Sequence, residues 1–282
     1  MDIRELNKND ILNILPDRKP DTYKGDYGRI LLLCGSRGYT GAAALSAMGA
    51  LRSGAGLVYL AVPESIYAIE AVKLTEPVVL PMPDECGMFS SDTPEQLAKL
   101  LPRMDAVLIG PGIGCSDGTY ATVKYVLEAF AGPVILDADG INVLQGHIDI
   151  LRGRTSSTVL TPHIGEFRRA GGQVTEDRIS DAKRLAAETG TVILLKGTKT
   201  VITDGFETYI NPTGNPGMAV GGCGDVLSGI IAALIGQGIS PVLAAACGAW
   251  LHGAAGDLCA DQLGQYGMLP TDMLQILPRL LK

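Results

Sequence analysis

Short apolar runs recur along the chain, separated by stretches with helical periodicity or many small residues. The runs have the length of strands that are buried on both faces of a sheet. They occupy residues 29–34, 57–62, 105–110, 133–139, 158–163 and 191–195. Helices are predicted between several of them, at residues 42–52, 118–130 and 175–189. This alternation predicts an α/β fold with a doubly wound, mainly parallel sheet and helices on both faces.

The pattern changes in the last third of the chain. Residues 201–210 are predicted to form a β-hairpin that turns at Asp204-Gly205. Further helices are predicted near residues 11–15, from 225 to 237, from 241 to 263 and near 271–281. His252 and Asp257 lie on the apolar helix 241–263, and both are assigned to packing in the core.

The composition supports a single packed domain. No long linker, change of composition or repeat of roughly 20–50 residues divides the sequence, so one domain is predicted over residues 1–282. The chain is 46% hydrophobic and contains 36 glycines, which predicts a large core with many tight turns and close helix–sheet contacts. These properties are typical of an enzyme scaffold.

The charge and the cysteines exclude several classes of function. The formal net charge is −7 and no stripe of Lys and Arg is present, which argues against nucleic-acid binding. The six cysteines include no C-x-x-C pair, so neither a zinc site nor a disulfide framework is predicted, and reduced thiols favour a cytoplasmic protein. The first residues lack the apolar segment of a signal peptide, and no association with membranes is expected.

A glycine-rich loop at residues 211–225 leads directly into an apolar helix. Gly221, Gly222 and Gly224 carry no Cβ, so their backbone N–H groups can approach an anion closely. The free N–H groups and the dipole of the following helix would stabilise a phosphate at the same point. Asp225 stands at this helix start, and we interpret it as a general base beside a phosphoryl group. A plain helix cap is the alternative.

Two further glycine loops follow predicted strands. Residues 35–41 and 110–114 come directly after apolar runs, at the edge where open α/β sheets bind ligands. The Gly-x-Gly-x-Gly spacing of the second loop differs from the dinucleotide fingerprint, so it does not indicate a Rossmann site.

Other polar residues at strand ends leave alternatives open. Asp137 and Asp139 either bind Mg²⁺ through water or cap the next helix. His163 is either a substrate contact or a structural residue. Lys196 and Lys199 flank a glycine and either hold nucleotide phosphates or belong to an ordinary solvated turn.

Seven short motifs are spread from about residue 24 to the end of the chain. They are Lys24-Gly25-x-x-Gly28, Gly35-Ser36-x-x-Tyr39-Thr40-Gly41-Ala42, Gly110-Pro-Gly112, Leu136-Asp-Ala-Asp139, Thr161-Pro-His163-x-Gly165-Glu166, Lys196-Gly197-x-x-Thr200 and Gly221-Gly-x-Gly-Asp225. In combination they resemble the NAD(P)H-hydrate dehydratases of the ribokinase-like superfamily, although each motif alone is weak. The resemblance implies a ribokinase-like α/β/α sandwich.

The resemblance also implies roles for individual residues. Ala42, Gly112, His163 and Asp225 match contacts to the hydrated nicotinamide substrate, and Asp225 matches the acid beside the terminal phosphate. The nucleotide contacts match Lys196, Gly197, Thr198, Lys199, Thr200 and Gly224. Cys223 and Ala43 depart from the family pattern, which usually has Thr and often Pro there. The glycine-rich loop at residues 211–225, the anion loop, keeps its backbone donors despite these differences.

By the same resemblance, the chain would use ADP or ATP with Mg²⁺ to dehydrate the S-epimer of hydrated NADH or NADPH. Many relatives carry an epimerase domain ahead of this one, and the chain looks like the stand-alone form, which in bacteria is typically ADP-dependent. A homotetramer is implied as well, and the metal ligands stay unassigned. The alternatives are a small-molecule kinase of the same superfamily, for a vitamin precursor or sugar, and a nucleotide-binding regulatory module without turnover.

Overall fold

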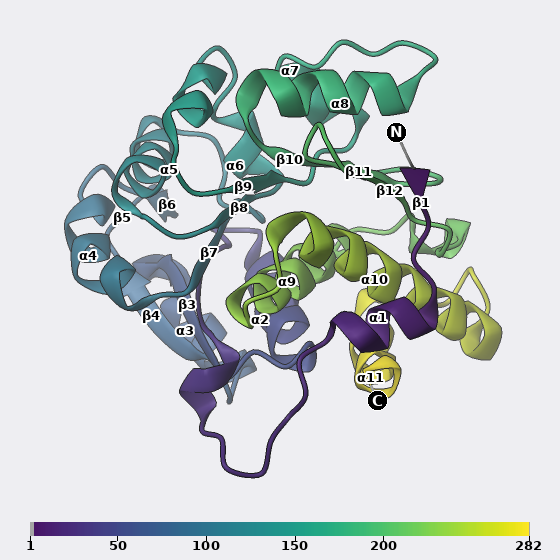
Figure 1. Cartoon of the computed structure of the whole chain (residues 1–282). Helices are drawn as coiled ribbons and strands as arrows, with labels where there is room; N and C mark the ends of the chain where they lie inside the picture. The colour runs from purple at the N-terminus through teal and green to yellow at the C-terminus, as the bar shows by residue number, and fades with distance from the viewer. Residues whose placement is uncertain (1–2, 282) are drawn as a thin grey trace.

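The computed structural model describes residues 3–281 and is built around one 10-stranded sheet (Figure 1). Its strands are β1 (Ile3–Arg4), β2 (Arg29–Leu33), β3 (Leu57–Pro63), β4 (Val78–Met82), β7 (Ala106–Ile109), β8 (Val134–Leu136), β9 (Thr158–Leu160), β10 (Val192–Leu195), β11 (Val201–Thr203) and β12 (Thr208–Ile210). Their order is β1-β12-β11-β10-β9-β8-β7-β2-β3-β4. Only the β10–β11 and β11–β12 pairs are antiparallel within this sheet of the described residues. The predicted mainly parallel α/β sheet is confirmed.

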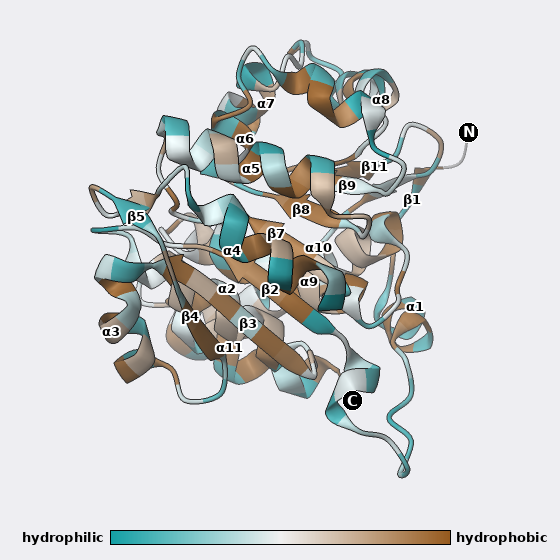
Figure 2. Ribbon diagram, turned by 90° about the vertical axis from the view of Figure 1, so that its left-hand side faces the viewer, coloured by the Kyte–Doolittle hydropathy of each residue, from teal (hydrophilic) through white to brown (hydrophobic). Residues whose placement is uncertain are grey.

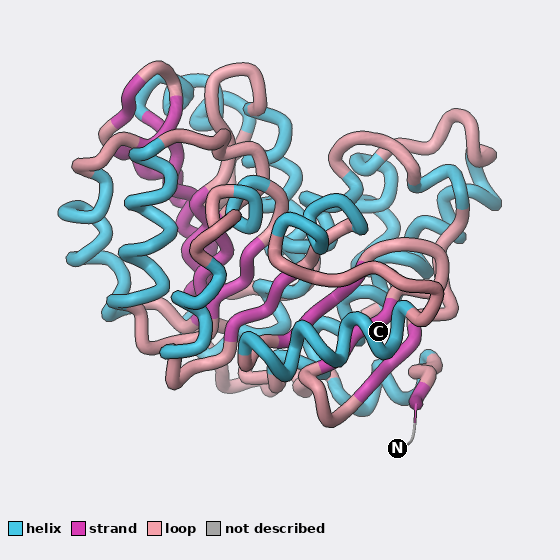
Figure 3. The backbone as a smooth tube through the Cα atoms, turned by 90° about the horizontal axis from the view of Figure 1, so that it is seen from above, coloured by secondary structure: helices cyan, strands magenta, loops and turns pink. Residues whose placement is uncertain are grey.

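Helices cover both faces of the sheet (Figure 3). They are α1 (Lys8–Ile14), α2 (Thr40–Arg52), α3 (Glu64–Lys73), α4 (Thr93–Leu100), α5 (Asp117–Ala129), α6 (Asp139–Asn142), α7 (Ile164–Arg169), α8 (Arg178–Thr189), α9 (Cys223–Gly236), α10 (Pro241–Leu263) and α11 (Pro270–Ile276). Alternate strand residues point to opposite faces, so Leu32 and Leu108 pack with α2, α9 and α10, whereas Leu31 and Val107 pack with α4, α5 and α8. Figure 2 shows the apolar strands between these layers.

The order of the strands reverses between β2 and β7. From β2 the chain continues outward to β3 and β4, and then returns to the other side of β2 with β7, β8, β9 and β10. Ligands of open α/β sheets bind at such a reversal, beyond the carboxyl ends of the strands. The loops that follow β2 and β7 leave the sheet at this place.

Helices α2 and α9 pack closely because glycines lie at their contact. A Cβ on Gly49 would lie 2.7 Å from the carbonyl oxygen of Val226, and a Cβ on Gly229 would collide with the carbonyl oxygen of Ser46. Neither position has room for a side chain, so the close approach requires glycine. This contact fixes the start of α9 beside α2 and therefore beside the loop that follows β2.

Several elements differ from the prediction. Strand β1, which lies beside β12 in Figure 1, and the small hairpin of β5 (Asp84–Glu85) and β6 (Met88–Phe89) were not predicted. Two-residue strands are too short to show a period of two in sequence. The helix predicted from residue 175 begins at Arg178, because the Asp177 side chain accepts hydrogen bonds from the Ile179 and Ser180 N–H groups, each at 3.1 Å.

Helix α10 is long and apolar enough to cross a membrane by length and composition, with a mean hydropathy of 1.3 over its most apolar window. However, 78% of that window is buried inside the protein. The helix packs against α9 and against the face of the sheet that α2 also covers. Such burial is typical of the core helix of an α/β protein.

Candidate active site

The loops that follow β2 and β7 meet at the reversal of strand order. The Gly35 N–H donates to the Pro111 carbonyl oxygen at 2.8 Å, and the Ser36 hydroxyl donates to the Gly112 carbonyl oxygen at 2.7 Å. Gly112 has a φ of 65°, and a Cβ there would lie 2.9 Å from the Cβ of Ala42. The structure therefore brings together Ala42 and Gly112, two residues predicted to contact the substrate.

The anion loop ends in an uncapped helix terminus. Gly222 is the N-cap of α9, with a φ of 101°, and no side chain in the described part of the chain caps this helix. Within residues 3–281 the backbone N–H groups of Gly224 and Asp225 have no recorded acceptor, so both are free for a ligand. A Cβ on Gly222 would lie 2.5 Å from the Leu45 side chain of α2, which sets the loop against that helix. The terminus has the donors and the dipole that an anion requires.

A buried group of charged residues lies beside this terminus. The Lys196 ammonium, at the end of β10, is 2.9 Å from Asp137 Oδ1 and 3.7 Å from Glu166 Oε2. A Cβ on Gly224 would lie 3.6 Å from Lys196 Nζ and 4.0 Å from Asp137 Oδ2. Burial alone would lower the pKa of Lys196, but the carboxylates of Asp137 and Glu166 outweigh it, and the pKa is raised. Lys196 is therefore a stable cation among carboxylates.

Asp225 faces this charged group from the first turn of α9. Burial, followed by repulsion from Asp137, raises the pKa of Asp225 from 3.8 to about 7, and the Lys196 ammonium opposes the rise. Asp225 is not the N-cap residue, and its carboxylate has no recorded hydrogen bond within the described part of the chain. The geometry disfavours the helix-cap alternative. A carboxylate with a pKa near neutrality is suited to general base catalysis at physiological pH.

His163 has a structural role at the start of α7. Its Nδ1 accepts hydrogen bonds from the N–H groups of Gly165, at 2.9 Å, and of Glu166, at 3.3 Å. In return, Glu166 Oε2 accepts a hydrogen bond from the His163 N–H at 2.8 Å. The two residues thus form a capping box. The His163 side chain remains 54% exposed, so it can also contact a ligand.

The side chain of Arg178 holds the loop after β10. Its guanidinium donates to the carbonyl oxygens of Thr198, at 2.8 Å, and Leu195, at 3.0 Å. Gly197, Thr198 and Lys199 are exposed, as nucleotide contacts require. The Lys196 ammonium points to Asp137, and its role as a nucleotide contact stays a prediction. Thr200 closes the turn through a 2.9 Å hydrogen bond to the Gly197 carbonyl oxygen.

The two aspartates after β8 have different roles. Asp139 Oδ2 accepts a hydrogen bond from the Gly114 N–H at 3.0 Å, so this residue fastens the loop that follows β7. Asp137 belongs to the charged group, and only its Oδ1 is used by Lys196 and the Ala138 N–H. Among the residues described, no group of three His, Cys, Asp or Glu side chains converges on a metal site.

The predictions for the α10 residues had different outcomes. His252 is buried, with 9% exposure, as expected for core packing. Asp257 does not pack in the core: its carboxylate accepts hydrogen bonds from the Gly214 N–H, at 2.9 Å, and the Asn215 amide, at 3.0 Å. This core assignment was wrong, because Asp257 fastens the start of the anion loop to α10.

The Cys223 thiol is buried 3.9 Å from the sulfur of Met273 and points away from the loop.

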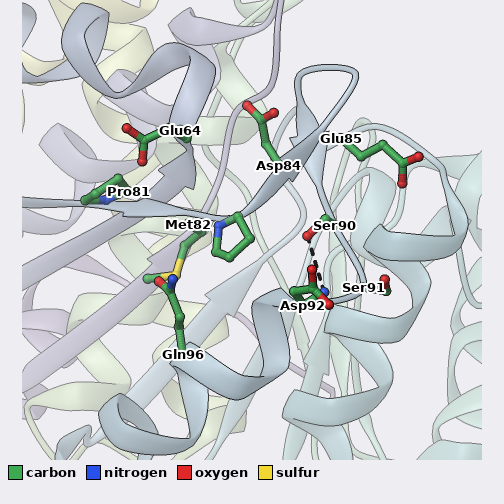
Figure 4. A pocket seen from close by; sticks show the side chains of 10 residues that line it. Glu64, Pro81, Met82, Asp84, Glu85, Ser90, Ser91, Asp92 and Gln96 are labelled. Carbon is green, nitrogen blue, oxygen red and sulfur yellow. Dashed lines mark hydrogen bonds between the residues drawn. The ribbon is translucent and has the colours of Figure 1, made fainter.

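A separate hollow of about 680 Å³ lies between the start of α3 and the β5–β6 hairpin (Figure 4). None of its lining residues belongs to the glycine loops or to the charged group. Glu64, Asp84, Glu85 and Asp92 line it, and no Lys or Arg of residues 3–281 does so. This acidic lining would repel phosphate groups, so the hollow is not a candidate nucleotide site.

Together these features define a doubly wound α/β enzyme with an anion-binding helix terminus beside a carboxylate that titrates near neutrality. The model of the NAD(P)H-hydrate dehydratase family matches residues 30–279 of the chain. The chain therefore belongs to the NAD(P)H-hydrate dehydratase family.

Individual relatives agree with this assignment. The chain is 46% identical over 275 residues to the bifunctional NAD(P)H-hydrate repair enzyme Nnr of Moorella thermoacetica, covering 95% of this chain and 52% of that protein. It thus spans about half the length of the curated relatives it matches. Its structure is similar to that of the ADP/ATP-dependent NAD(P)H-hydrate dehydratase from Bacillus subtilis, co-crystallised with ATP and Mg²⁺, with a TM-score of 0.85, 33% identity and coverage of 99% and 98%. A ribokinase-like superfamily protein from Enterococcus faecalis gives a TM-score of 0.86 at 30% identity, with coverage of 99% and 95%.

The sequence did not reveal the roles of two residues of the site, Glu166 and Arg178. Glu166 was quoted only as part of a motif, although it both caps α7 and approaches Lys196 at 3.7 Å. Its position three residues after His163 is the spacing of a capping box and could have indicated the first role. Arg178 gave no signal, because its acceptors are backbone carbonyls near residue 196, far along the chain.

Proposed function

We propose that this chain uses ADP or ATP to remove water from the S-epimer of hydrated NADH or NADPH and thereby restores the reduced nucleotide. The observation that carries the proposal is the carboxylate of Asp225, whose pKa is raised to about 7, at the uncapped start of α9 in a member of this family. The dehydratase from Bacillus subtilis, similar over 99% of this chain, is described as ADP/ATP-dependent.

The substrate and the nucleotide would approach Asp225 from two sides. The hydrated nicotinamide ring would lie on the paired loops at Ala42 and Gly112, and the exposed edge of His163 is available to contact it. The nucleotide would lie along residues 197–200, with its terminal phosphate at the free N–H groups of Gly224 and Asp225. This arrangement would place an alcohol and a phosphoryl group at the same carboxylate.

The reaction follows from this placement. Asp225 accepts the proton of the substrate hydroxyl while that oxygen attacks the terminal phosphorus, and the bond from phosphorus to the bridging oxygen of the nucleotide breaks. The backbone donors of α9 stabilise the negative charge on the transferred group. The lone pair of the ring nitrogen then expels the phosphorylated hydroxyl as phosphate. Loss of the proton from the neighbouring ring carbon restores NAD(P)H, so one nucleotide loses its terminal phosphate for each hydrate repaired.

A magnesium ion fits the donors that are present. Asp137 Oδ2 has no recorded hydrogen bond in the described structure, and a Cβ on Gly224, the residue before Asp225, would lie 4.0 Å from it. One or two carboxylates together with phosphate oxygens and water are the ligands that Mg²⁺ prefers in proteins. When bound, Mg²⁺ would neutralise phosphate charge. We propose Asp137 as its protein ligand, while Asp225 remains the general base.

The test is a direct assay of the repaired product. Purified protein is incubated with prepared hydrate, Mg²⁺ and either ADP or ATP, and the recovery of nicotinamide absorbance is followed together with the release of phosphate. We expect one phosphate for each NAD(P)H, with ADP at least as effective as ATP. If the hydrate is unchanged while a vitamin precursor or sugar is phosphorylated, the chain is a kinase of the same superfamily. A cytoplasmic homotetramer stays a prediction, which gel filtration with light scattering and cell fractionation would check.

A further inference from the structure

Helix α3 carries a fully buried carboxylate, Glu70, whose one partner among the described residues is Lys73. The Glu70 side chain has 0% exposure, and its Oε1 is 3.1 Å from the Lys73 ammonium. Its Oε2 has no hydrogen-bond partner among the described residues. Burial raises the pKa of Glu70, although Lys73 opposes the rise. Burying a carboxylate with one unsatisfied oxygen beside a lysine that is 37% exposed costs stability, so the arrangement calls for another explanation.

The ammonium of this pair extends to helix α2. Lys73 Nζ donates a hydrogen bond to the Thr40 hydroxyl at 2.7 Å. Thr40 is the first residue of α2, and Ala42, two residues later, lies against Gly112. The pair on α3 is thus connected to the loop on which we place the hydrated nicotinamide ring.

Ser36, whose hydroxyl donates to the Gly112 carbonyl oxygen, holds the beginning of this loop, and few side-chain hydrogen bonds hold the rest of it. The N-cap residue Tyr39 makes no side-chain capping hydrogen bond. Built Cβ atoms on Gly38 and Gly41 would meet nothing within 4 Å, so no described group packs on the side of the backbone where those Cβ atoms would lie. For residues 37–42, the Lys73 contact is the only side-chain hydrogen bond recorded in the described structure.

We propose that Glu70 and Lys73 are positioning residues for the substrate loop. The buried carboxylate holds the ammonium on Thr40, and this contact fixes the first turn of α2 so that Ala42 faces Gly112 in the geometry that the hydrate requires. The inference rests on the proposed function for its substrate. It concerns the hydrate and not the nucleotide, because the anion loop and residues 196–200 have their own anchors in Asp257 and Arg178. A displacement of the loop by about 1 Å is enough to impair binding and turnover of a positioned substrate.

The kinetic test compares Lys73→Met and Thr40→Val with a control, Lys124→Met. Lys124 forms an exposed ion pair with Glu128 at 3.9 Å on α5, so its replacement also removes a helical lysine but leaves the loop unchanged. We expect KM for the hydrate to rise about tenfold in both test variants, the worth of one hydrogen bond to a charged group. KM for the nucleotide should stay within twofold, and Lys73→Arg should restore most of the loss. Thr40→Val leaves the buried pair intact, so the test does not depend on the folding of the Lys73 variant.

A second measurement does not depend on the reaction. Hydrogen exchange of the backbone amides in residues 36–44 should be faster in Lys73→Met and Thr40→Val than in Lys124→Met, with residues 223–236 unchanged. If the wild-type protein does not act on the hydrate, the proposed function fails, and exchange still decides whether Lys73 holds the loop. The inference is overturned if exchange matches the control. It is equally overturned if KM for the hydrate stays within twofold of the control, or if both KM values rise together, which is the result of a general loosening of the fold.

Discussion

Replacing Asp225 by Asn separates a general base from a structural residue. Asn has nearly the same size and caps helices as well as Asp, so a purely capping role would survive the change. A positioned general base contributes roughly 10²–10⁴-fold to turnover, and Asn cannot accept the proton. We therefore expect turnover of the hydrate to fall by about that factor. Binding of ADP should survive, because the N–H groups of Gly224 and residue 225 remain free.

The Asp225→Asn variant should be more stable than wild type, although its turnover falls. The pKa of Asp225 in the folded protein, about 7, lies above its ordinary value of 3.8, so ionised Asp225 destabilises the fold. The cost is absent below pH 3.8, grows as the pH rises, and is complete above pH 7, where the difference corresponds to about 4 kcal/mol. Asn does not ionise, but burying its amide costs about 1–2 kcal/mol. The net gain above pH 8 should be about 2–3 kcal/mol, or several degrees in Tm.

The assay measures Tm, ADP binding and hydrate turnover for both proteins at pH 5 and pH 8.5. We expect Asp225→Asn to melt higher than wild type at pH 8.5 and to lose this advantage at pH 5, where the wild-type carboxyl is protonated. In wild type, kcat/KM should rise through pH 7 as Asp225 ionises, and this limb should be missing in the variant. Turnover within a few-fold of wild type would refute the base assignment. A lower Tm at both pH values would refute the argument from burial.

Three other changes test neighbouring parts of the site. Lys196→Met should move the rise of kcat/KM with pH to higher pH, since Lys196 lowers the pKa of Asp225. Thermal unfolding should show a loss of about 3–5 kcal/mol, because the carboxylate of Asp137 is left unpaired. An unchanged pH profile would contradict the effect of Lys196 on Asp225. Arg178→Met should raise KM for the nucleotide about tenfold and leave KM for the hydrate unchanged, because the loop after β10 loses several hydrogen bonds to its carbonyl oxygens. Equal increases of the two KM values would argue that Arg178 does not act on the nucleotide loop alone. Cys223→Thr should keep turnover within about tenfold, because the thiol points inward; a loss of several orders of magnitude would reveal a chemical role.

Local patterns in the sequence predicted much of the fold and the backbone of the site. The buried strands, the glycine loops after β2 and β7, and the start of α9 each depend on residues that are close together in sequence. Asp225 could be predicted because a carboxylate after three glycines and before an apolar run is a local signal. The pairing of Ala42 with Gly112 could be anticipated only through the family resemblance, since it requires β2 and β7 to be neighbours.

The remaining parts of the site depend on tertiary contacts that no window of sequence contains. Lys196 and Asp137 are 59 residues apart, and Asp257 is 43 residues from the Gly214 N–H that it binds. An aspartate on an apolar helix resembles any other until its partner is known, which is why the core assignment of Asp257 failed. The raised pKa of Asp225 likewise follows from burial and from Asp137, so sequence could suggest its role but not its titration.

The charges around Gly224 predict that ADP affinity and kcat change in opposite directions with pH. The carboxylates of Asp137, Glu166 and Asp225 outnumber the ammonium of Lys196 among them, so a nucleotide phosphate enters a group of charges that is already negative. Protonation of Asp225 below pH 7 removes one of these charges and should strengthen ADP binding while it abolishes the base. In calorimetric titrations with Mg²⁺, ADP affinity should therefore rise as pH falls from 8 to 6, as kcat falls. In Asp225→Asn the affinity should be nearly independent of pH over this range. If wild-type affinity and kcat decline together below pH 7, Asp225 does not lie beside the phosphate, and the placement of the nucleotide at α9 is wrong.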